Sequence, residues 1–505
     1  MGVLKRIILI LCTVSMLIPS LLSSLFLLPA LVFAGTCWDG GYSGVAPWAV
    51  KSAANHNVDS VGYADINYCV NTVAASGDTV NIPSGSATWA TGLNLTKAVR
   101  LVGADTWPDP TDETTYVSNT LITNNSSTQL ITISPSSPAD NPYIEITGLT
   151  LIANSAGTKG GIHVYCVNTE HYYTNFRIHH NHIRDAVSGT GINVFGYSYG
   201  LIDHNYLYNN YQDIANEVTI TAWTLYPKDG NGNLIFSSLG MGGPNFLFVE
   251  NNIFKGSHSQ EIVSSGGART VVRYNTYRSP LRMIDIHGEN EGSGMTASNM
   301  AAEAYNNVGT SPEPIGMMGL PKHRGGVALI YNNTGNVYAN SVSRMGVAIG
   351  EGASLYCDTT ANYRGYRQKP HNSYVWNNKN IADNLLQYTG TNLNGTDYDP
   401  LGCLTEQTDY YKDVLDNSHD RNTYFSYDVA ANRNLTDCTT ENVYWETDNK
   451  KLYRCTATNT WTFVYKPYIY PHPLQGISNK GATVINTIGG LNAIDIVGGL
   501  NVINQ

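Results

Sequence analysis

Short segments in which apolar residues alternate with polar ones recur along the chain, and each ends near an asparagine. In the four clear copies, apolar residues lie three positions before and two positions after that asparagine. The clear copies end at Asn181, Asn205, Asn251 and Asn275, and weaker copies end at Asn306, Asn332 and Asn377. The first two copies are 24 residues apart, as are the next two. A fixed period of this length is typical of a solenoid.

A coil of roughly two dozen residues cannot bury its own apolar face. We therefore expect successive coils to stack strand on strand at about 4.8 Å, which gives an all-β solenoid. Asparagine suits the recurring corner, because it tolerates left-handed backbone angles and its amide can bond to the same amide in the next coil. The side chains just before it form a stripe, either a platform for sugar rings or ordinary stacking between coils. That stripe comprises His180, His204, Glu250, Tyr274, Tyr305, Tyr331 and Trp376.

Three regions of the sequence resemble one known group of proteins. They are the stretches 77–85 and 93–103 near the start, 266–275 and 285–288 in the middle, and 465–474 at the end. In these stretches the chain resembles the pectate-lyase-like right-handed parallel β-helix superfamily, and more closely its bacterial secreted right-handed β-helix repeat proteins. The resemblance covers about residues 60 to 475. It implies a single-stranded right-handed parallel β-helix, but the superfamily includes lyases, hydrolases, isomerases and binding proteins.

The pattern predicts five segments along the chain. Residues 1–34 read as a signal peptide, with Lys5 and Arg6 before an apolar run and Ala34 at the cleavage position, so we expect a secreted or cell-surface protein. Left uncleaved, the same run is long enough to anchor the chain in a membrane. We expect an N-terminal cap over 35–60, the β-helix over 61–390, a β-hairpin insertion and closing segment over 391–475, and a low-complexity tail over 476–505.

Composition narrows the possible partners. Charged residues make up 13% of the 505 residues and the net charge is -10, which leaves no basic field for a nucleic-acid backbone. Removal of the leader leaves an odd number of cysteines with no CxxC spacing, which does not indicate a metal cluster. In an exported protein some of them pair, and Cys438 with Cys455 is a plausible local pair.

Candidate chemistry lies on outward-facing strand positions, because side chains fill the interior of such a helix. In Ile284–His287 the isoleucines are expected in the core, with Asp285 and His287 facing solvent. The same alternation exposes His163 and Tyr165 in 162–165 and Asn193 and Phe195 in 192–195, and Glu261 begins a comparable strand. Stacked strands place His163, Asn193, Glu261, Asp285 and His287 along one face, flanked by Arg269, Lys322, His323 and Arg324. We expect substrate contacts from His163, Asn193, Glu261, Arg273, His323 and Arg324.

This mixture suits cleavage of an acidic polysaccharide. A lyase removes the proton beside a uronate carboxyl, so it needs a base and a cation that neutralises the carboxylate. The candidate bases are His287, Arg269 and Lys322, and Asp285 with Glu261 is the candidate pair for Ca²⁺. A hydrolase would instead pair Asp285 with Glu261 or Glu289. The chain has neither the paired aspartates of polygalacturonase-like hydrolases nor the acidic calcium cluster of a pectate lyase.

Two functions from different classes therefore remain open. The first is a secreted polysaccharide lyase that acts on acidic polysaccharide. The second is a non-catalytic glycan-binding or adhesin scaffold, in which His287 satisfies a turn and Arg269 and Arg273 pair with neighbouring carboxylates. Asp285, His287 and Arg269 gathered in one groove would favour the enzyme, and scattered positions would favour the scaffold.

Overall fold

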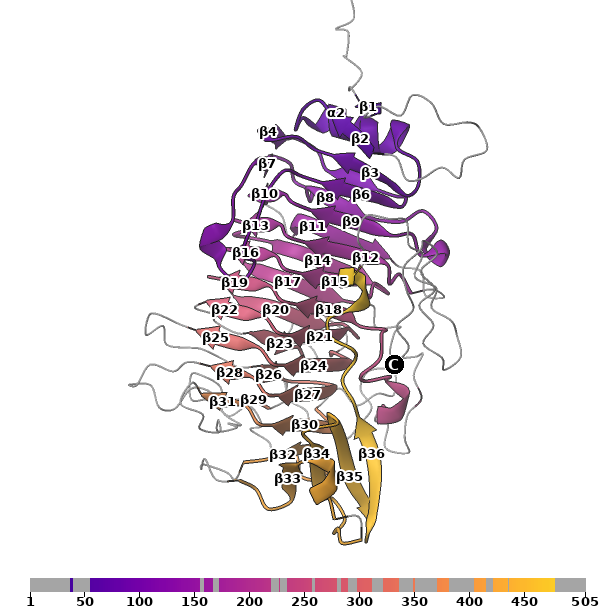
Figure 1. The fold of residues 1–505 in the computed structure, drawn as a ribbon, viewed down its shortest axis with the longest axis vertical. Coiled ribbons are helices and arrows are strands. Elements are labelled where there is room, and N and C mark those ends of the chain that lie inside the picture. The colour runs from indigo at the N-terminus through magenta and orange to yellow at the C-terminus, as the bar shows by residue number, and fades with distance from the viewer. Residues whose placement is uncertain are drawn as a thin grey trace, which may run out of the picture.

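Three parallel sheets wind around one long axis, with each coil contributing one strand to each sheet in the order A, B, C (Figure 1). The computed structural model describes residues 37–39, 55–154, 159–166, 172–218, 227, 234–256, 259–278, 283–288, 298–310, 321–335, 348–349, 370–380, 404–414, 421–434 and 436–476. The predicted parallel β-helix is confirmed. The predicted leader and tail lie outside the described residues. Within the described part, no helix is long and apolar enough to cross a bilayer.

The strands of the three sheets stack in register from coil to coil. Sheet A contains β1 (Cys37–Asp39), β2 (Asn55–Val58), β3 (Asp78–Asn81), β6 (Val99–Val102), β9 (Ile144–Thr147), β12 (Phe176–His179), β15 (Leu201–Asp203), β18 (Leu247–Glu250), β21 (Arg269–Arg273), β24 (Ala301–Tyr305), β27 (Val327–Tyr331), β30 (Ser373–Trp376) and β32 (Tyr410–Lys412). Sheet B contains β4 (Gly85–Trp89), β7 (Thr120–Asn124), β10 (Thr150–Ile152), β13 (His182–Arg184), β16 (Tyr206–Tyr208), β19 (Ile253–Lys255), β22 (Thr276–Arg278), β25 (Val308–Thr310), β28 (Thr334–Gly335) and β31 (Lys379–Asn380). Sheet C contains β5 (Leu93–Leu95), β8 (Ile131–Ile133), β11 (Lys159–Cys166), β14 (Thr190–Gly196), β17 (Gln212–Glu217), β20 (Gln260–Ser265), β23 (Ile284–Ile286), β26 (Lys322–His323) and β29 (Ala348–Ile349).

The N-terminal end of the solenoid carries a short helical cap. Helix α2 (Tyr63–Tyr68) continues into a π-helical turn (Cys69–Val73), and Ile66, Cys69 and Val70 pack into the apolar core. A disulfide joins Cys69 to Cys37 in β1, the strand that pairs antiparallel with β2. The cap thereby covers apolar surface that the first coil would otherwise expose. The described 3₁₀ turns are Glu113–Thr115, Pro138–Asp140, Phe236–Ser238, Ala430–Asn432 and Pro473–Gly476.

The corner between sheets A and B uses two adjacent residues for two separate tasks. His180, His204, Asn251, Tyr274, Asn306, Asn332 and Asn377 adopt the left-handed backbone that makes the turn. The next residue points inward, and its side-chain amide bonds to its counterpart one coil on. This ladder runs through Asn181, Asn205, Asn252, Asn275, Asn307, Asn333 and Asn378, with Nδ2 to Oδ1 distances of 2.9–3.1 Å.

The predicted asparagine ladder is therefore present, but in the Asn-Asn pairs the prediction chose the wrong asparagine of the two. There the first asparagine turns the chain and the second enters the ladder, for example Asn251 and Asn252. The predicted stripe is corrected by the same observation, since it mixes two columns. His180, His204 and Tyr274 belong to the turn, whereas Glu250, Tyr305, Tyr331 and Trp376 belong to the outer face of sheet A.

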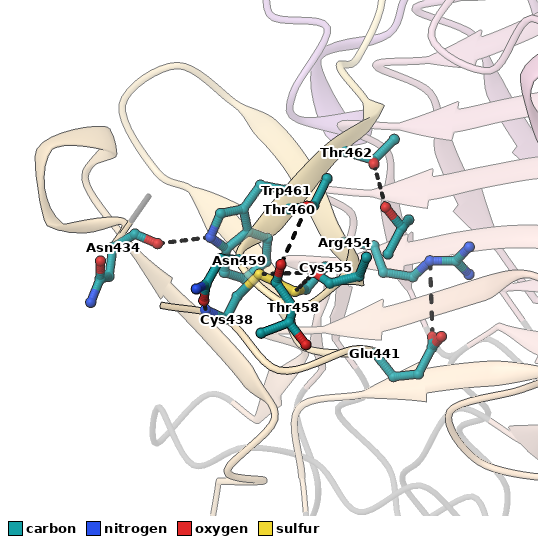
Figure 2. Close-up of a disulfide and its surroundings, with 12 residues drawn as sticks. Asn434, Cys438, Glu441, Arg454, Cys455, Thr458, Asn459, Thr460, Trp461 and Thr462 are labelled. Carbon is teal, nitrogen blue, oxygen red and sulfur yellow. Dashed lines mark hydrogen bonds and ion pairs between the residues drawn. A yellow bond between two sulfur atoms is a disulfide. The ribbon is translucent and has the colours of Figure 1, made fainter. Parts of the chain in front are cut away.

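The C-terminal part folds back against the outside of sheet A. Strands β33 (Phe425–Asp428), β34 (Val443–Glu446), β35 (Lys451–Ala457) and β36 (Thr460–Tyr465) form a small sheet, and a disulfide joins Cys438 to Cys455, as the sequence suggested (Figure 2). Beyond β36, residues 466–476, here called the closing segment, run along sheet A (Figure 1) as far as Arg177 in β12, which donates to the backbone oxygen of Gln475. A second apolar cluster, which includes Phe248, Tyr331, Trp445 and Tyr465, joins these parts.

We predict that Asn275→Ala lowers the free energy of unfolding by about 2–4 kcal/mol, because its amide donates to the backbone oxygens of Val249 and Arg273 and to Asn307. Asn306→Gly is the matched control, since glycine accepts the left-handed turn at φ 55° and the cost stays below about 1 kcal/mol. Thermal unfolding followed by circular dichroism measures both. Equal losses of stability would contradict the division of tasks at this corner.

Candidate functional site

The outer face of sheet C carries two columns of side chains. The first runs through His163, Asn193, Ala215, Val263, Asp285 and Lys322, which occupy equivalent positions in successive coils. The second begins with Tyr165, Phe195, Glu217 and Ser265. Backbone hydrogen bonds at the strand ends continue it to His287 and Arg324. The structure thus stacks His163, Asn193 and Asp285 as predicted, although Ala215 and Val263 separate them into two polar groups.

Asp285 lies at the centre of the lower group. Arg324 donates two parallel hydrogen bonds to its carboxylate, from Nε to Oδ1 at 3.0 Å and from Nη2 to Oδ2 at 2.8 Å. Lys322 is the neighbour of Asp285 in the next strand. Burial would raise the pKa of Asp285, but the charges of Arg324, His287 and Lys322 lower it below its usual value. The carboxylate therefore stays ionised, and it cannot serve as a general acid.

Most of the predicted contact residues are not open to solvent, which corrects that expectation. The exposed fractions are 1% for Asp285, 2% for Arg324, 8% for Lys322 and 3% for His163. Only Asn193 and His287 of the predicted face are partly exposed. An outward strand position is accessible only where nothing packs over the sheet, and alternation says nothing about such covering.

Two of the predicted residues point away from this face. His323 lies on the core side of sheet C, where its Nε2 is 2.8 Å from Ser373 Oγ, and burial lowers its pKa to about 3. Glu261 is fully buried. Its neighbours are Asp213 and Tyr277, and Tyr277 belongs to the apolar core. Burial of these two neighbours raises their pKa values, and the negative charge of Glu261 raises them further. Neither residue lines a surface that a substrate could reach.

Arg269 and Arg273 belong to sheet A, where both side chains hold neighbouring segments of the chain against the sheet. Arg269 donates to the backbone oxygen of Leu239 and lies 4.4 Å from the ring centroid of Phe246. Arg273 is fully buried and donates to Glu250 and to the Tyr305 hydroxyl. It also holds two backbone oxygens of the closing segment, at 2.8 Å each. Their predicted catalytic and substrate-binding roles are therefore replaced by packing roles.

The predicted calcium ligands do not form a site in the described structure. Arg324 occupies both oxygens of Asp285, and its positive charge would repel a cation there. Glu261 has different neighbours, Asp213 and Tyr277. Among the described residues, no group of three or more histidine, cysteine or acidic side chains is arranged to hold a metal ion.

A cluster that the sequence analysis missed lies on the outer face of sheet A, where Arg177 donates to the backbone oxygen of Gln475 at the end of the closing segment. Glu145 accepts hydrogen bonds from Arg100 at 2.6 Å and from the Tyr143 hydroxyl at 2.8 Å, and His179 Nε2 lies 2.9 Å away. One coil further on, Arg177 donates two hydrogen bonds to the carboxylate of Asp203. Strict alternation in 99–102, 144–147 and 176–179 already places these side chains outward, so the pattern could have revealed them.

We predict that Arg324→Met lowers the free energy of unfolding by about 3–5 kcal/mol, because the buried carboxylate of Asp285 loses its guanidinium partner. The double variant Arg324→Met/Asp285→Asn should recover part of this loss, since no buried charge is left uncompensated. Urea unfolding of the wild type, both single variants and the double variant gives the coupling energy. A coupling energy near zero would show that the two side chains act independently.

A second prediction concerns acid stability. Burial would raise the pKa of Glu145, but the bonds and charges of His179 and Arg100 lower it from its usual 4.5 to about 2. A carboxylate with a lowered folded-state pKa stabilises fully above pH 4.5, and this stabilisation is lost as the pH falls towards 2. We expect Glu145→Gln to destabilise the protein at neutral pH and to flatten the dependence of Tm on pH over this window. Identical slopes for wild type and variant would contradict the assignment.

Comparison with known proteins gives distant structural similarity only. No family model matches the chain, and no curated protein matches it. The chain is similar to an alginate lyase from Paenibacillus sp. str. FPU-7 (TM-score 0.31, 11% identity, 58% of this chain and 97% of that one). It is also similar to ORF18 of Geobacillus virus E2 (0.27, 12%, 64% and 54%) and to a tailspike protein double mutant of E. coli bacteriophage HK620 (0.29, 13%, 62% and 66%). The chain thus spans about half of the first of these viral proteins and just under two thirds of the second. At these scores, any argument about function rests on the residues themselves.

Proposed function

We propose that this is an exported, carbohydrate-active β-helix protein that binds an acidic polysaccharide along the outer face of sheet C and cleaves it as a lyase. The observation that supports this most is the group of polar side chains at the C-terminal end of the two columns on sheet C. There His287, Lys322 and Arg324 lie in adjacent coils around Asp285. A titratable imidazole beside two cations is the combination that β-elimination next to a carboxylate requires.

The upper end of the second column provides a surface for sugar rings. The Tyr165 and Phe195 rings stack at 5.8 Å with an angle of 13° between their planes, and Tyr165 is 39% exposed. Flat aromatic faces combined with a few polar groups are typical of carbohydrate contacts. Asn193, partly exposed in the neighbouring column, supplies an amide beside them.

In the proposed reaction His287 removes the proton from the carbon beside the uronate carboxyl. The electron pair forms a carbon–carbon double bond as the bond to the leaving sugar oxygen breaks, and that oxygen takes up a proton. Lys322 contributes positive charge opposite the substrate carboxylate as negative charge develops. Arg324 is a positioning residue, since both of its bonds go to Asp285.

Export is part of the proposal. Disulfides form and persist outside the reducing cytosol, and the described chain contains two, Cys37–Cys69 and Cys438–Cys455. Both secure end structures of the solenoid, the N-terminal cap and the C-terminal sheet. This agrees with the apolar leader that the sequence indicates.

A non-catalytic glycan-binding or adhesin scaffold is the second candidate. It is favoured by the position of Arg269 on sheet A, apart from Asp285 and His287 on sheet C, and by the contact of His287 Nδ1 with the backbone oxygen of Gly288 at 2.8 Å, as expected of a residue that satisfies a turn. It is also favoured by the burial of Asp285 and Arg324, which neutralise each other at exposures of 1% and 2%. On this alternative the aromatic pair on sheet C binds glycan, and the lower cluster only holds adjacent coils together.

The two candidates are separated by ultraviolet absorbance of unsaturated sugar ends. Purified protein is incubated with alginate, polygalacturonate and other acidic polysaccharides, with and without Ca²⁺. We expect absorbance to rise with the wild type and the rate to fall about 100-fold or more in His287→Ala, which removes the proposed base. His204→Ala, at the corner between sheets A and B, is the matched control and should retain the wild-type rate.

Absence of absorbance on every substrate, with retardation in affinity electrophoresis that Tyr165→Ala abolishes, would replace the lyase with the scaffold. Equal loss of activity in His287→Ala and His204→Ala would contradict the placement of the base. Absence of both cleavage and retardation would overturn carbohydrate recognition on sheet C.

A further inference from the structure

The outer face of sheet B carries a column that the proposed function does not use. Arg184, Tyr208, Lys255 and Arg278 occupy equivalent positions in four successive coils, at the C-terminal ends of β13, β16, β19 and β22. These strands lie along the left edge of the molecule in Figure 1. All four side chains are accessible, with exposed fractions of 33%, 36%, 43% and 37% respectively. Tyr208 lies between Arg184 and Lys255, so one aromatic face is flanked by positive charges on both sides.

The charges in this column are only partly compensated. Arg184 bonds to Asp185 at 2.6 Å. Lys255 Nζ and Arg278 Nε each lie 3.6 Å from a carboxylate oxygen of Glu113, beyond the 2.7–2.9 Å or so of a charge-assisted hydrogen bond. Asp112 adds a third carboxylate, which interacts electrostatically with Arg278. Carboxylates therefore match the three cations in number, but the contacts of Lys255 and Arg278 with Glu113 are long. A guanidinium has five donor hydrogens and an ammonium three, so both side chains retain capacity for a further acceptor.

A packed loop fixes one side of this column. Trp107 and Tyr116 lie over sheet B, where they contact Tyr206 and His182 with ring centroids 6.5 Å and 5.3 Å apart. This anchoring brings Glu113 close to Lys255 and Arg278, so their side chains are held near the sheet before any ligand arrives. Pre-ordered side chains lose less conformational entropy on binding.

We propose that this column is a second binding track for acidic polysaccharide, separate from the cleavage site on sheet C. Strand stacking repeats its side chains every 4.8 Å or so along the solenoid, a step comparable to one sugar unit of an extended glycan. Uronate carboxylates pair with Lys255 and Arg278, and a sugar face rests on Tyr208. The ligand class is that of the proposed function, on which this inference rests. The track holds the polymer while sheet C acts on another part of it.

Affinity electrophoresis of the full-length protein in gels with polygalacturonate, with dextran as the neutral control, tests the track. Lys255→Ala/Arg278→Ala should weaken binding about tenfold, and the difference should shrink as NaCl is added. Lys451→Ala/Lys466→Ala removes the same charge from the C-terminal sheet and the segment after it, and should bind like the wild type. Tyr208→Ala should weaken binding, and Tyr208→Phe should restore it.

The track is overturned if both double variants bind equally well, or if polyphosphate binds as tightly as polygalacturonate and Tyr208→Ala has no effect. Cleavage of a short oligosaccharide distinguishes this failure from failure of the proposed function. If the track exists, Lys255→Ala/Arg278→Ala raises KM for the polymer and leaves turnover of the short substrate unchanged. If sheet C has no activity, neither substrate is cleaved, but the difference between the two double variants in the gel persists.

Discussion

Parallel stacking of coils is the constraint on which the rest of this structure depends. Each backbone position repeats in the next coil at one strand spacing, so any side chain placed there must tolerate a copy of that position above and below it. The buried asparagine ladder satisfies this condition, because an amide both donates and accepts. Charged side chains need a partner of opposite sign nearby, because like charges can otherwise face each other from coil to coil, as Asp203 and Glu250 do within one column of sheet A. There Asp203 pairs with Arg177, and Glu250 pairs with Arg273.

The three outer faces consequently have different roles. Sheet A is covered in its C-terminal half by apolar packing and by the closing segment, which Arg273 and Glu250 hold in place. Its N-terminal half carries the network around Glu145 and Asp203, in which both carboxylates already have cationic partners. A negatively charged substrate would gain little there. Sheet B retains exposed cationic side chains beside Tyr208, and sheet C retains the exposed ring of Tyr165 and the partly exposed His287, which is why the proposed binding surfaces lie on these two sheets.

The sequence was sufficient for the solenoid, because the period and the alternation report directly on stacked strands. It also indicated the Cys438–Cys455 disulfide and the shared column of His163, Asn193 and Asp285. The sequence could not show which asparagine of an Asn-Asn pair makes the turn, because both residues fit the same pattern and only the backbone conformation distinguishes them. Burial of Asp285 and Lys322 was also beyond it, because alternation separates the core side from the outer side but does not reveal what covers the outer side.

The pair formed by Asp285 and Arg324 shows how this fold limits its own chemistry. A buried ion pair contributes little net stability, but separating its members is costly, so neither side chain is available as an acid or as a metal ligand. Its effect on catalysis must act through its neighbours. With Asp285 bonded to Arg324, Lys322 in the next strand and His287 in the adjacent column are the candidates for catalysis on this face. Any elimination reaction on sheet C therefore depends on an imidazole and an ammonium held in place by an inert pair.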